Sequence, residues 1–176
     1  MANFNAFFST LLGFEGGFVD DPDDPGGATN KGITMKTFSG CARGVLGIEP
    51  ALDNLKALTD EQAGKIYKAL YWDKVRGDDI TLQELANIVF DFYVNAGGHA
   101  TKLLQSVMNE AGAHIVVDGG IGPATIQALQ DLDQRDVYRH YKQGRIDYYR
   151  GLAASQPSLA KFLNGWLNRV NAFPDL

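Results

Sequence analysis

Several classes of protein are excluded by what the sequence lacks. A single cysteine, Cys41, has no partner for an intramolecular disulfide bond, which is typical of a protein made in the cytosol. No run of apolar residues approaches the ~20 that a membrane-spanning helix needs. Residues 1–4 carry no basic side chain, so we expect no cleavable signal peptide. The sequence therefore predicts a chain made in the cytoplasm that does not insert into a membrane.

Positive charge is also scarce. The chain has 16 Lys and Arg against 21 Asp and Glu, which gives a net charge of −5 at pH 7. A dedicated nucleic-acid-binding protein needs surplus cations to neutralise phosphates, so we expect no nucleic-acid partner. His99, His114 and His140 show no metal-ligand spacing with one another or with Cys41. We therefore predict no metal site, and nothing in the sequence calls for a cofactor.

What the chain does contain is apolar helical periodicity. Hydrophobic residues make up 45% of its 176 residues, enough for the core of one globular body. Capping-box patterns begin at Thr59 and Thr81, Pro123 suits a first helical turn, and Gly97 suits a helix end. Stretches rich in Gly, Asp and Pro predict loop or hairpin structure over residues 16–34 and a loop over 39–54. The fold class predicted is mainly α, with helices expected near residues 4–15, 59–70, 81–96, 103–111, 123–132, 135–154 and 158–172.

A carboxyl group ends the first predicted helix. Glu15 lies eleven positions after Phe4 and seven after Phe8, hence within about 20° of both on a helix. Burial on that face would disfavour the charged carboxylate, as suits a general acid. Gly16 and Gly17 follow, and they leave backbone space for a bulky ligand. On spacing alone, a Glu15 that turns to solvent or pairs with Lys or Arg stays an alternative.

The next loop holds four aspartates within residues 20–24. A calcium-binding EF-hand register starting at Asp21 fails, since it places Pro25 at position 5 and Gly32 where the bidentate Glu belongs. Most of the run is expected to be a solvated acidic turn. Glycoside hydrolysis pairs an acid with a second group across the scissile bond. Asp21 is the preferred second carboxylate, and the Thr29 hydroxyl can position a water molecule.

Residues 15–34 read EGGFVDDPDDPGGATNKGIT. This segment resembles the signature of glycoside hydrolase family 108, an E-G-G-aromatic turn followed by D-P-x-D-P-G-G-x-T-N-x-G-I-T. That family comprises N-acetylmuramidases of bacteria and phages, some formerly called secretion activator proteins. The resemblance implies a lysozyme-like helical fold with a short irregular or β-hairpin region after the first helix, and Glu15 as the catalytic acid. Phe18 stands where Tyr is usual, and Ala28 where an acidic residue is common, so those two polar groups are missing here.

Two later segments extend the resemblance. Residues 91–97, DFYVNAG, are similar to a second family segment near the cleft, which implies that Asp91 and Asn95 bind substrate. Asn30 is assigned to substrate binding as well, because amides such as those of Asn30 and Asn95 hydrogen-bond acetamido and hydroxyl groups. Gly16 and Gly17 are assigned to it because of the backbone space that they leave. The tail, centred on VDGGIGPAT at 117–125, resembles the predicted peptidoglycan-binding region that accompanies the family. We therefore expect a catalytic region, 1–97, and a helical peptidoglycan-binding region, 98–176, that share one core.

The function predicted is that of a peptidoglycan hydrolase with lysozyme activity. Glu15 would act as general acid on the β-1,4 bond between N-acetylmuramic acid and N-acetylglucosamine, with glycan strands as partner. Such a bacteriolytic enzyme of endolysin or prophage type would need a holin or another export route to reach the wall. A non-enzymatic wall-binding or secretion-regulating protein is one alternative, and a lytic transglycosylase is a nearer one. The sequence does not predict an oligomeric state.

Overall fold

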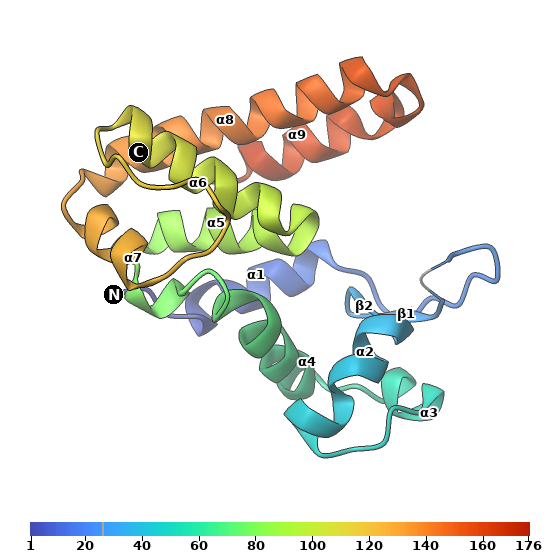
Figure 1. Ribbon diagram of the computed structural model, residues 1–176. Helices are drawn as coiled ribbons and strands as arrows, with labels where there is room; N and C mark the ends of the chain where they lie inside the picture. Colours follow the sequence, from blue (N-terminus) through green and yellow to red (C-terminus); the bar gives the residue numbers. More distant parts are fainter. Residues whose placement is uncertain (26) are drawn as a thin grey trace. The chain divides into compact units, whose positions relative to one another are not determined.

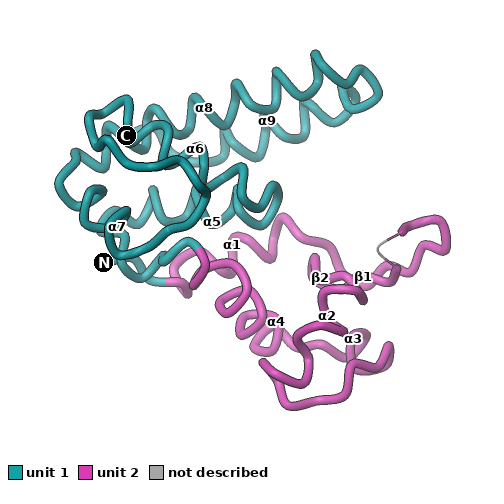
Figure 2. Tube along the Cα trace, viewed as in Figure 1, with its two compact units in different colours: residues 1–3, 75–176 teal, residues 4–74 magenta. Residues whose placement is uncertain are grey.

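The computed structural model describes residues 1–25 and 27–176 (Figure 1). The described residues are mainly helical, with a two-stranded antiparallel hairpin after the first helix, so the predicted fold class is confirmed. The chain divides into two compact units, coloured separately in Figure 2. One comprises residues 4–74, and the other comprises residues 1–3 and 75–176.

In its described residues, the unit formed by 4–74 carries the hairpin and four α-helices. Its core includes the fully buried side chains of Leu11, Phe38, Leu55, Ile66 and Trp72. π-Helical turns over Ala42–Leu46 and Lys68–Trp72 follow the second and fourth helices. Its regular elements are α1 (Asn5–Phe14), β1 (Thr29–Asn30), β2 (Ile33–Thr34), α2 (Met35–Cys41), α3 (Leu52–Lys56) and α4 (Asp60–Tyr67).

The loop predicted over residues 39–54 is wrong. The end of α2, the first π-helical turn and α3 occupy most of this stretch. Phe38, Cys41 and Ala42 are buried at helical spacing, and this apolar face outweighs the neighbouring glycines. At Gly40 and Gly44 a Cβ would meet no other atom within 4 Å, so these glycines lie on the open face of the helix and do not break it.

The hairpin is closed by two residues with positive φ. Thr29 pairs with Thr34 and Asn30 with Ile33, which leaves Lys31 (φ 52°) and Gly32 (φ 77°) as the turn. Positive φ at both central residues is the type I′ geometry, whose twist matches that of the two strands. Val19 adds a third extended position, because its backbone exchanges two hydrogen bonds of 2.7 Å with Thr29.

The other unit is a bundle built around one long helix. In it, α8 (Gln134–Ser155) packs against α5 (Gln83–Ala96), α6 (Gly98–Glu110) and α9 (Leu163–Asn171), and α7 (Pro123–Gln130) packs against α6 (Figure 1). The predicted last helix, 158–172, is α9 preceded by a 3₁₀ turn over Pro157–Phe162. A second 3₁₀ turn, Gly77–Asp79, precedes α5.

Three of the four predicted capping positions are confirmed, and the helix expected from residue 103 begins earlier, at Gly98. Thr59 and Gln62 form the predicted capping box of α4, Pro123 occupies the first turn of α7, and Gly97 ends α5. The capping box expected at Thr81 is wrong, since α5 begins after Leu82. The Leu82 amide instead donates to the Gln134 side chain, at 2.8 Å. A residue 52 positions away thus replaces the local cap.

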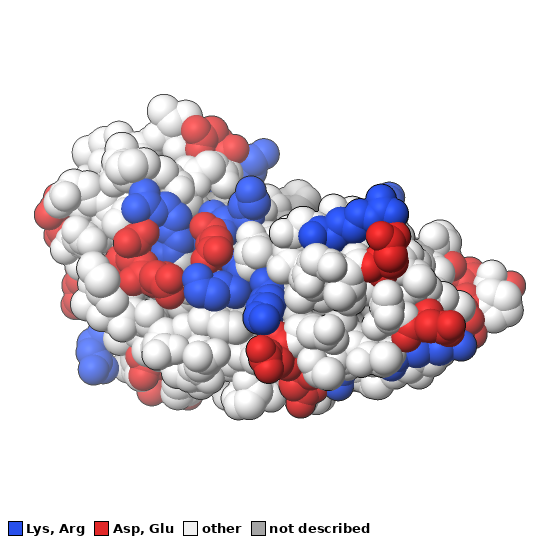
Figure 3. Space-filling view, turned by 90° about the horizontal axis from the view of Figure 1, so that it is seen from below, with Lys and Arg blue, Asp and Glu red and all other residues white. Residues whose placement is uncertain are grey.

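Charge and hydropathy over the described residues agree with the composition. Lys and Arg side chains lie interspersed with Asp and Glu on the face seen in Figure 3. Within the described part of the chain, no helix is long and apolar enough to cross a membrane. The same residues contain no group of three or more His, Cys, Asp or Glu side chains arranged to hold a metal ion.

Cys41 is buried in the unit formed by residues 4–74. Burial raises the pKa of its thiol, as in a structural cysteine.

Candidate active site

Glu15 sits where α1 ends. Its backbone is extended (φ −89°, ψ 146°), and its amide donates to the Leu11 carbonyl at 3.3 Å. The side chain is half-buried. Because the helix stops at Phe14, the helical angle used in the sequence prediction does not by itself place the carboxyl group. The hairpin turn places it.

Gly32 provides the space that the Glu15 carboxyl group occupies. A Cβ on residue 32 would lie 2.7 Å from Glu15 Oε2 and 2.9 Å from Glu15 Cδ. It would come still closer to the hydroxyl oxygen of Tyr67. The carboxyl group, the hydroxyl group and the hairpin turn therefore meet at one point, and that point has room only for a glycine.

Tyr67 is a member of this site that is not among the site residues predicted from the sequence. It ends α4, is 1% exposed, and donates its hydroxyl hydrogen to the Lys31 carbonyl at 2.8 Å. Its ring centroid lies 5.9 Å from that of Phe8 on α1. A buried tyrosine hydroxyl needs a polar partner, and that requirement was the signal that could have linked Tyr67 to the hairpin.

The closeness of α1 and α4 rests on a second glycine. A Cβ on Gly64 would lie 3.0 Å from Phe8 Cε1, so the ring of Phe8 packs directly over the α4 backbone. The helix that ends at Glu15 and the helix that ends at Tyr67 are thereby held together. The site is thus positioned by three elements of one compact unit.

Asp21 and Thr29 lie on different parts of the same unit. Asp21 is exposed, and its Oδ1 accepts from the backbone N–H of Asp23 at 2.9 Å, in a local turn. Thr29 is in β1 and half-buried, with both backbone groups paired to Val19. Neither residue contributes one of the three atoms nearest to the missing Cβ of Gly32. Their predicted roles stay predictions.

Asn30 holds the hairpin to α3. Its amide nitrogen donates to the carbonyl oxygens of Leu55 (2.8 Å) and Lys56 (3.2 Å), and the residue is 5% exposed. An amide nitrogen has two hydrogens, and both are used here inside the protein. Only the amide oxygen is left for a ligand.

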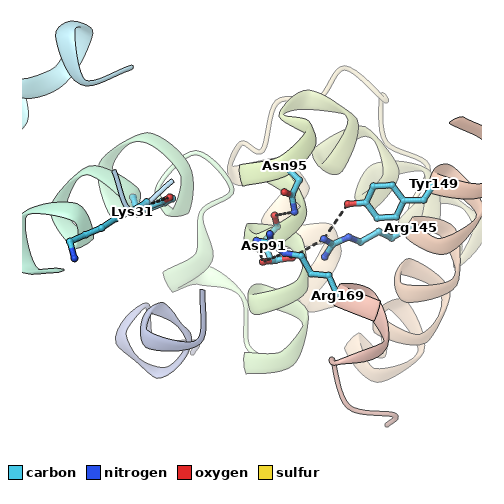
Figure 4. A network of polar contacts seen from close by, with 7 residues as sticks. Lys31, Asp91, Asn95, Arg145, Tyr149 and Arg169 are labelled. Carbon is cyan, nitrogen blue, oxygen red and sulfur yellow. Dashed lines mark hydrogen bonds and ion pairs between the residues drawn. The ribbon is translucent and has the colours of Figure 1, made fainter. Parts of the chain in front are cut away.

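Asp91 forms a buried ion-pair network in the other unit (Figure 4). It is fully buried, and its carboxylate accepts from Arg145 Nη2 at 2.7 Å and from Arg169 Nη2 at 2.8 Å. Arg169 Nε adds two longer bonds of 3.2 Å. A side chain with no exposed surface does not fit the predicted sugar contact. We infer that Asp91 instead joins α5 to α8 and α9.

The Arg145 guanidinium completes this network with aromatic rings. Its central carbon lies 4.9 Å from the ring centroid of Phe92, 5.6 Å from Tyr149 and 5.7 Å from Phe173. Within the described part of the chain, its Nε and Nη1 atoms have no hydrogen-bond acceptor. The ring faces offset part of the cost of burying the second positive charge.

The other predicted contact residues lie at the surface. Asn95, in the last turn of α5, is exposed, and its amide donates to the Asp91 carbonyl at 3.1 Å (Figure 4). Gly16 and Gly17 are exposed and have open space where a Cβ would point. Phe18 is 37% exposed, with Lys56 Nζ 5.4 Å from its ring centroid. Asn95, Gly16 and Gly17 are open to a ligand, and their predicted roles stay predictions.

Comparison with known proteins gives the class to which this fold and site belong. Residues 8–97 match the family described as Glycosyl hydrolase 108, and residues 99–171 match the family described as Predicted Peptidoglycan domain. Among solved structures, SagA of Brucella abortus is similar, with 32% sequence identity and a TM-score of 0.70 over 97% of this chain and 94% of that chain. No curated protein matches the chain.

These matches define a glycoside hydrolase whose second half is a peptidoglycan-binding region. Together they support a peptidoglycan hydrolase that acts on the cell wall. The chain belongs to glycosyl hydrolase family 108.

Proposed function

We propose that the protein is an N-acetylmuramidase, a lysozyme that cleaves the β-1,4 bond between N-acetylmuramic acid and N-acetylglucosamine. The observation that carries the proposal is the half-buried carboxyl group of Glu15, held against Gly32 beside Tyr67 within the segment that matches the hydrolase family. A general acid needs such a fixed and partly desolvated carboxyl group. The peptidoglycan region at residues 99–171 supports a glycan strand as the substrate.

In the proposed reaction Glu15 transfers its proton to the glycosidic oxygen as the bond to the anomeric carbon breaks. The sugar passes through an oxocarbenium-like state, and a water oxygen then bonds to the anomeric carbon. The proton released by that water returns to the protein, so that Glu15 regains its acid form. No cofactor enters these steps.

Asp21 and Thr29 are the two proposed partners on the opposite side of the bond. A carboxylate partner about 5–5.5 Å from the acid gives retention, whereas one about 6.5–9.5 Å away leaves room for water and gives inversion. The exposed turn that holds Asp21 favours the water route, with Thr29 as the residue that orients the water. The anomeric configuration of the first product, followed by NMR, distinguishes the two routes.

The cellular role follows from the substrate. A muramidase of this kind would be bacteriolytic, as in an endolysin encoded by a prophage, and would meet the wall after release through a holin or another export route. We also propose that residues 1–97 perform the chemistry while residues 98–176 bind the wall, with one core in common.

The decisive experiment is a Glu15→Gln variant assayed on purified peptidoglycan. We expect clearing of the suspension to slow by roughly 10²–10⁴-fold, because the amide cannot donate an acidic proton. Glu61→Gln, an exposed change on α4, is the matched control and should clear normally. Mass spectrometry of the released fragments should show reducing muramic acid ends.

Three outcomes contradict the proposal. A folded Glu15→Gln protein that clears like the wild type removes Glu15 from the chemistry. Anhydro-sugar ends in the products identify a lytic transglycosylase. Binding of the wild-type protein to the wall without clearing identifies a non-enzymatic wall-binding or secretion-regulating protein.

A further inference from the structure

Lys31 ties the hairpin turn to both ends of α4. Its carbonyl accepts the hydrogen bond from Tyr67, the last residue of the helix, at 2.8 Å. Its ammonium group pairs with Asp60, the first residue of the helix, at 2.7 Å. The turn that forms one wall of the Glu15 carboxyl site is therefore attached to α4 at two points.

From this arrangement we propose that Tyr67 is the positioning residue for Glu15. The proposal rests on the function proposed above, in which Glu15 is the acid. The Tyr67 hydroxyl and the Glu15 carboxyl group both lie against the position that a Cβ of Gly32 would occupy. The hydroxyl thus forms part of the wall that limits where the carboxyl group can move.

Tyr67 itself is well fixed. It is 1% exposed, and its ring contacts those of Phe8 (centroids 5.9 Å apart) and Tyr71 (5.5 Å). Phe8 belongs to the same helix, α1, whose end carries Glu15. The Tyr67 ring thus packs against the helix that ends at Glu15, while its hydroxyl is bonded to the hairpin turn.

The hydrogen bond that Tyr67 makes assigns it to positioning rather than to proton transfer. A tyrosine hydroxyl has a single hydrogen, and Tyr67 donates it to the Lys31 carbonyl. This bond to the hairpin turn favours a positioning role over transfer of the hydroxyl proton to a substrate. Its contribution is to hold the reacting carboxyl group in place, and errors of about 1 Å in such placement cost up to about 10²-fold in rate.

The test is a Tyr67→Phe variant, which keeps the ring and removes the hydroxyl. On peptidoglycan we expect kcat to fall by roughly 10–100-fold with KM within about twofold of wild type, because the acid is misplaced while sugar contacts stay. Tyr141→Phe is the matched control. Tyr141 is fully buried and also donates to a backbone carbonyl, that of Ala100, at 3.0 Å. It should lose similar stability and no activity.

A double variant separates positioning from general weakening of the fold. If Tyr67 acts through Glu15, adding Tyr67→Phe to Glu15→Gln causes no further loss of the residual rate. Additive losses, or a Tyr67→Phe protein that behaves like Tyr141→Phe, overturn the positioning role and leave the muramidase proposal intact. Full activity of Glu15→Gln overturns the muramidase proposal, and the positioning role falls with it.

Discussion

Gly32 meets two requirements at once, one of backbone and one of space. Its φ of 77° belongs to the left-handed region, and its missing Cβ leaves room for the carboxyl group of Glu15 and the hydroxyl of Tyr67. Lys31 shows that a positive φ alone admits another residue in this turn, so the missing Cβ is the stricter requirement. Together they make the tip of the hairpin a part of the site and not only a connection between strands.

We expect Gly32→Ala to reduce both activity and stability. The strained φ alone costs about 1–3 kcal/mol, and the new methyl group displaces the Glu15 carboxyl group. Clearing of peptidoglycan and the midpoint of urea unfolding measure the two effects. Gly40→Ala is the control, because that glycine lies in α2 with open space around it and should be neutral or stabilising. A Gly32→Ala protein with normal clearing would contradict the role given to this turn.

The residues of the site could be predicted from the sequence only in part. Glu15 was found because a long motif begins at it, and motif spacing is visible in one dimension. Tyr67 was not linked to it, because a buried hydroxyl predicts only that a polar partner exists, and no sequence pattern shows that the partner is the Lys31 carbonyl, 36 positions away. Asn30 and Asp91 were noticed as polar residues in motifs, but their burial depends on packing.

At the scale of elements, the Asn30 side chain joins β1 to the end of α3. We expect Asn30→Ala to lower the free energy of unfolding by about 1–3 kcal/mol, since it removes the buried side-chain donor to the carbonyl oxygens of Leu55 and Lys56. Thermal unfolding measures the loss. A sugar-contacting Asn30 predicts the opposite pattern, a raised KM at unchanged stability, and that result would restore the role predicted from the sequence.

Helix positions were predicted well, and the errors share a cause. The capping box at Thr59 is local, so four consecutive residues suffice to predict it. The capping box expected at Thr81 does not form, because the Leu82 amide donates to the side chain of the distant residue Gln134. Glycines at 40 and 44 suggested a loop, yet burial of Phe38 and Ala42 forms a helix there. Local chemistry was sufficient only where no tertiary contact competed with it.

At the scale of the whole molecule, the Asp91 network places one carboxylate and two guanidinium groups in the interior, where α5, α8 and α9 meet. We expect Asp91→Ala to destabilise its unit by about 3–5 kcal/mol, because two guanidinium groups lose their shared carboxylate. Urea unfolding followed by circular dichroism measures this. Asp147→Ala, a change on α8 outside this network, is the control and should have little effect. Stability equal to wild type in Asp91→Ala would refute the structural role and favour a contact with substrate.

The same network has a consequence for how such genes can be recombined. Asp91 belongs to the segment that matches the hydrolase family, whereas Arg145 and Arg169 belong to the segment that matches the peptidoglycan family. A crossover near residue 98 would separate the Asp91 carboxylate from the two arginine side chains that neutralise its charge. A chimaera made at that point inherits a buried charge without its partners, unless the incoming half supplies both arginines. Exchange of the wall-binding half between relatives is thereby restricted to halves that carry the same pair.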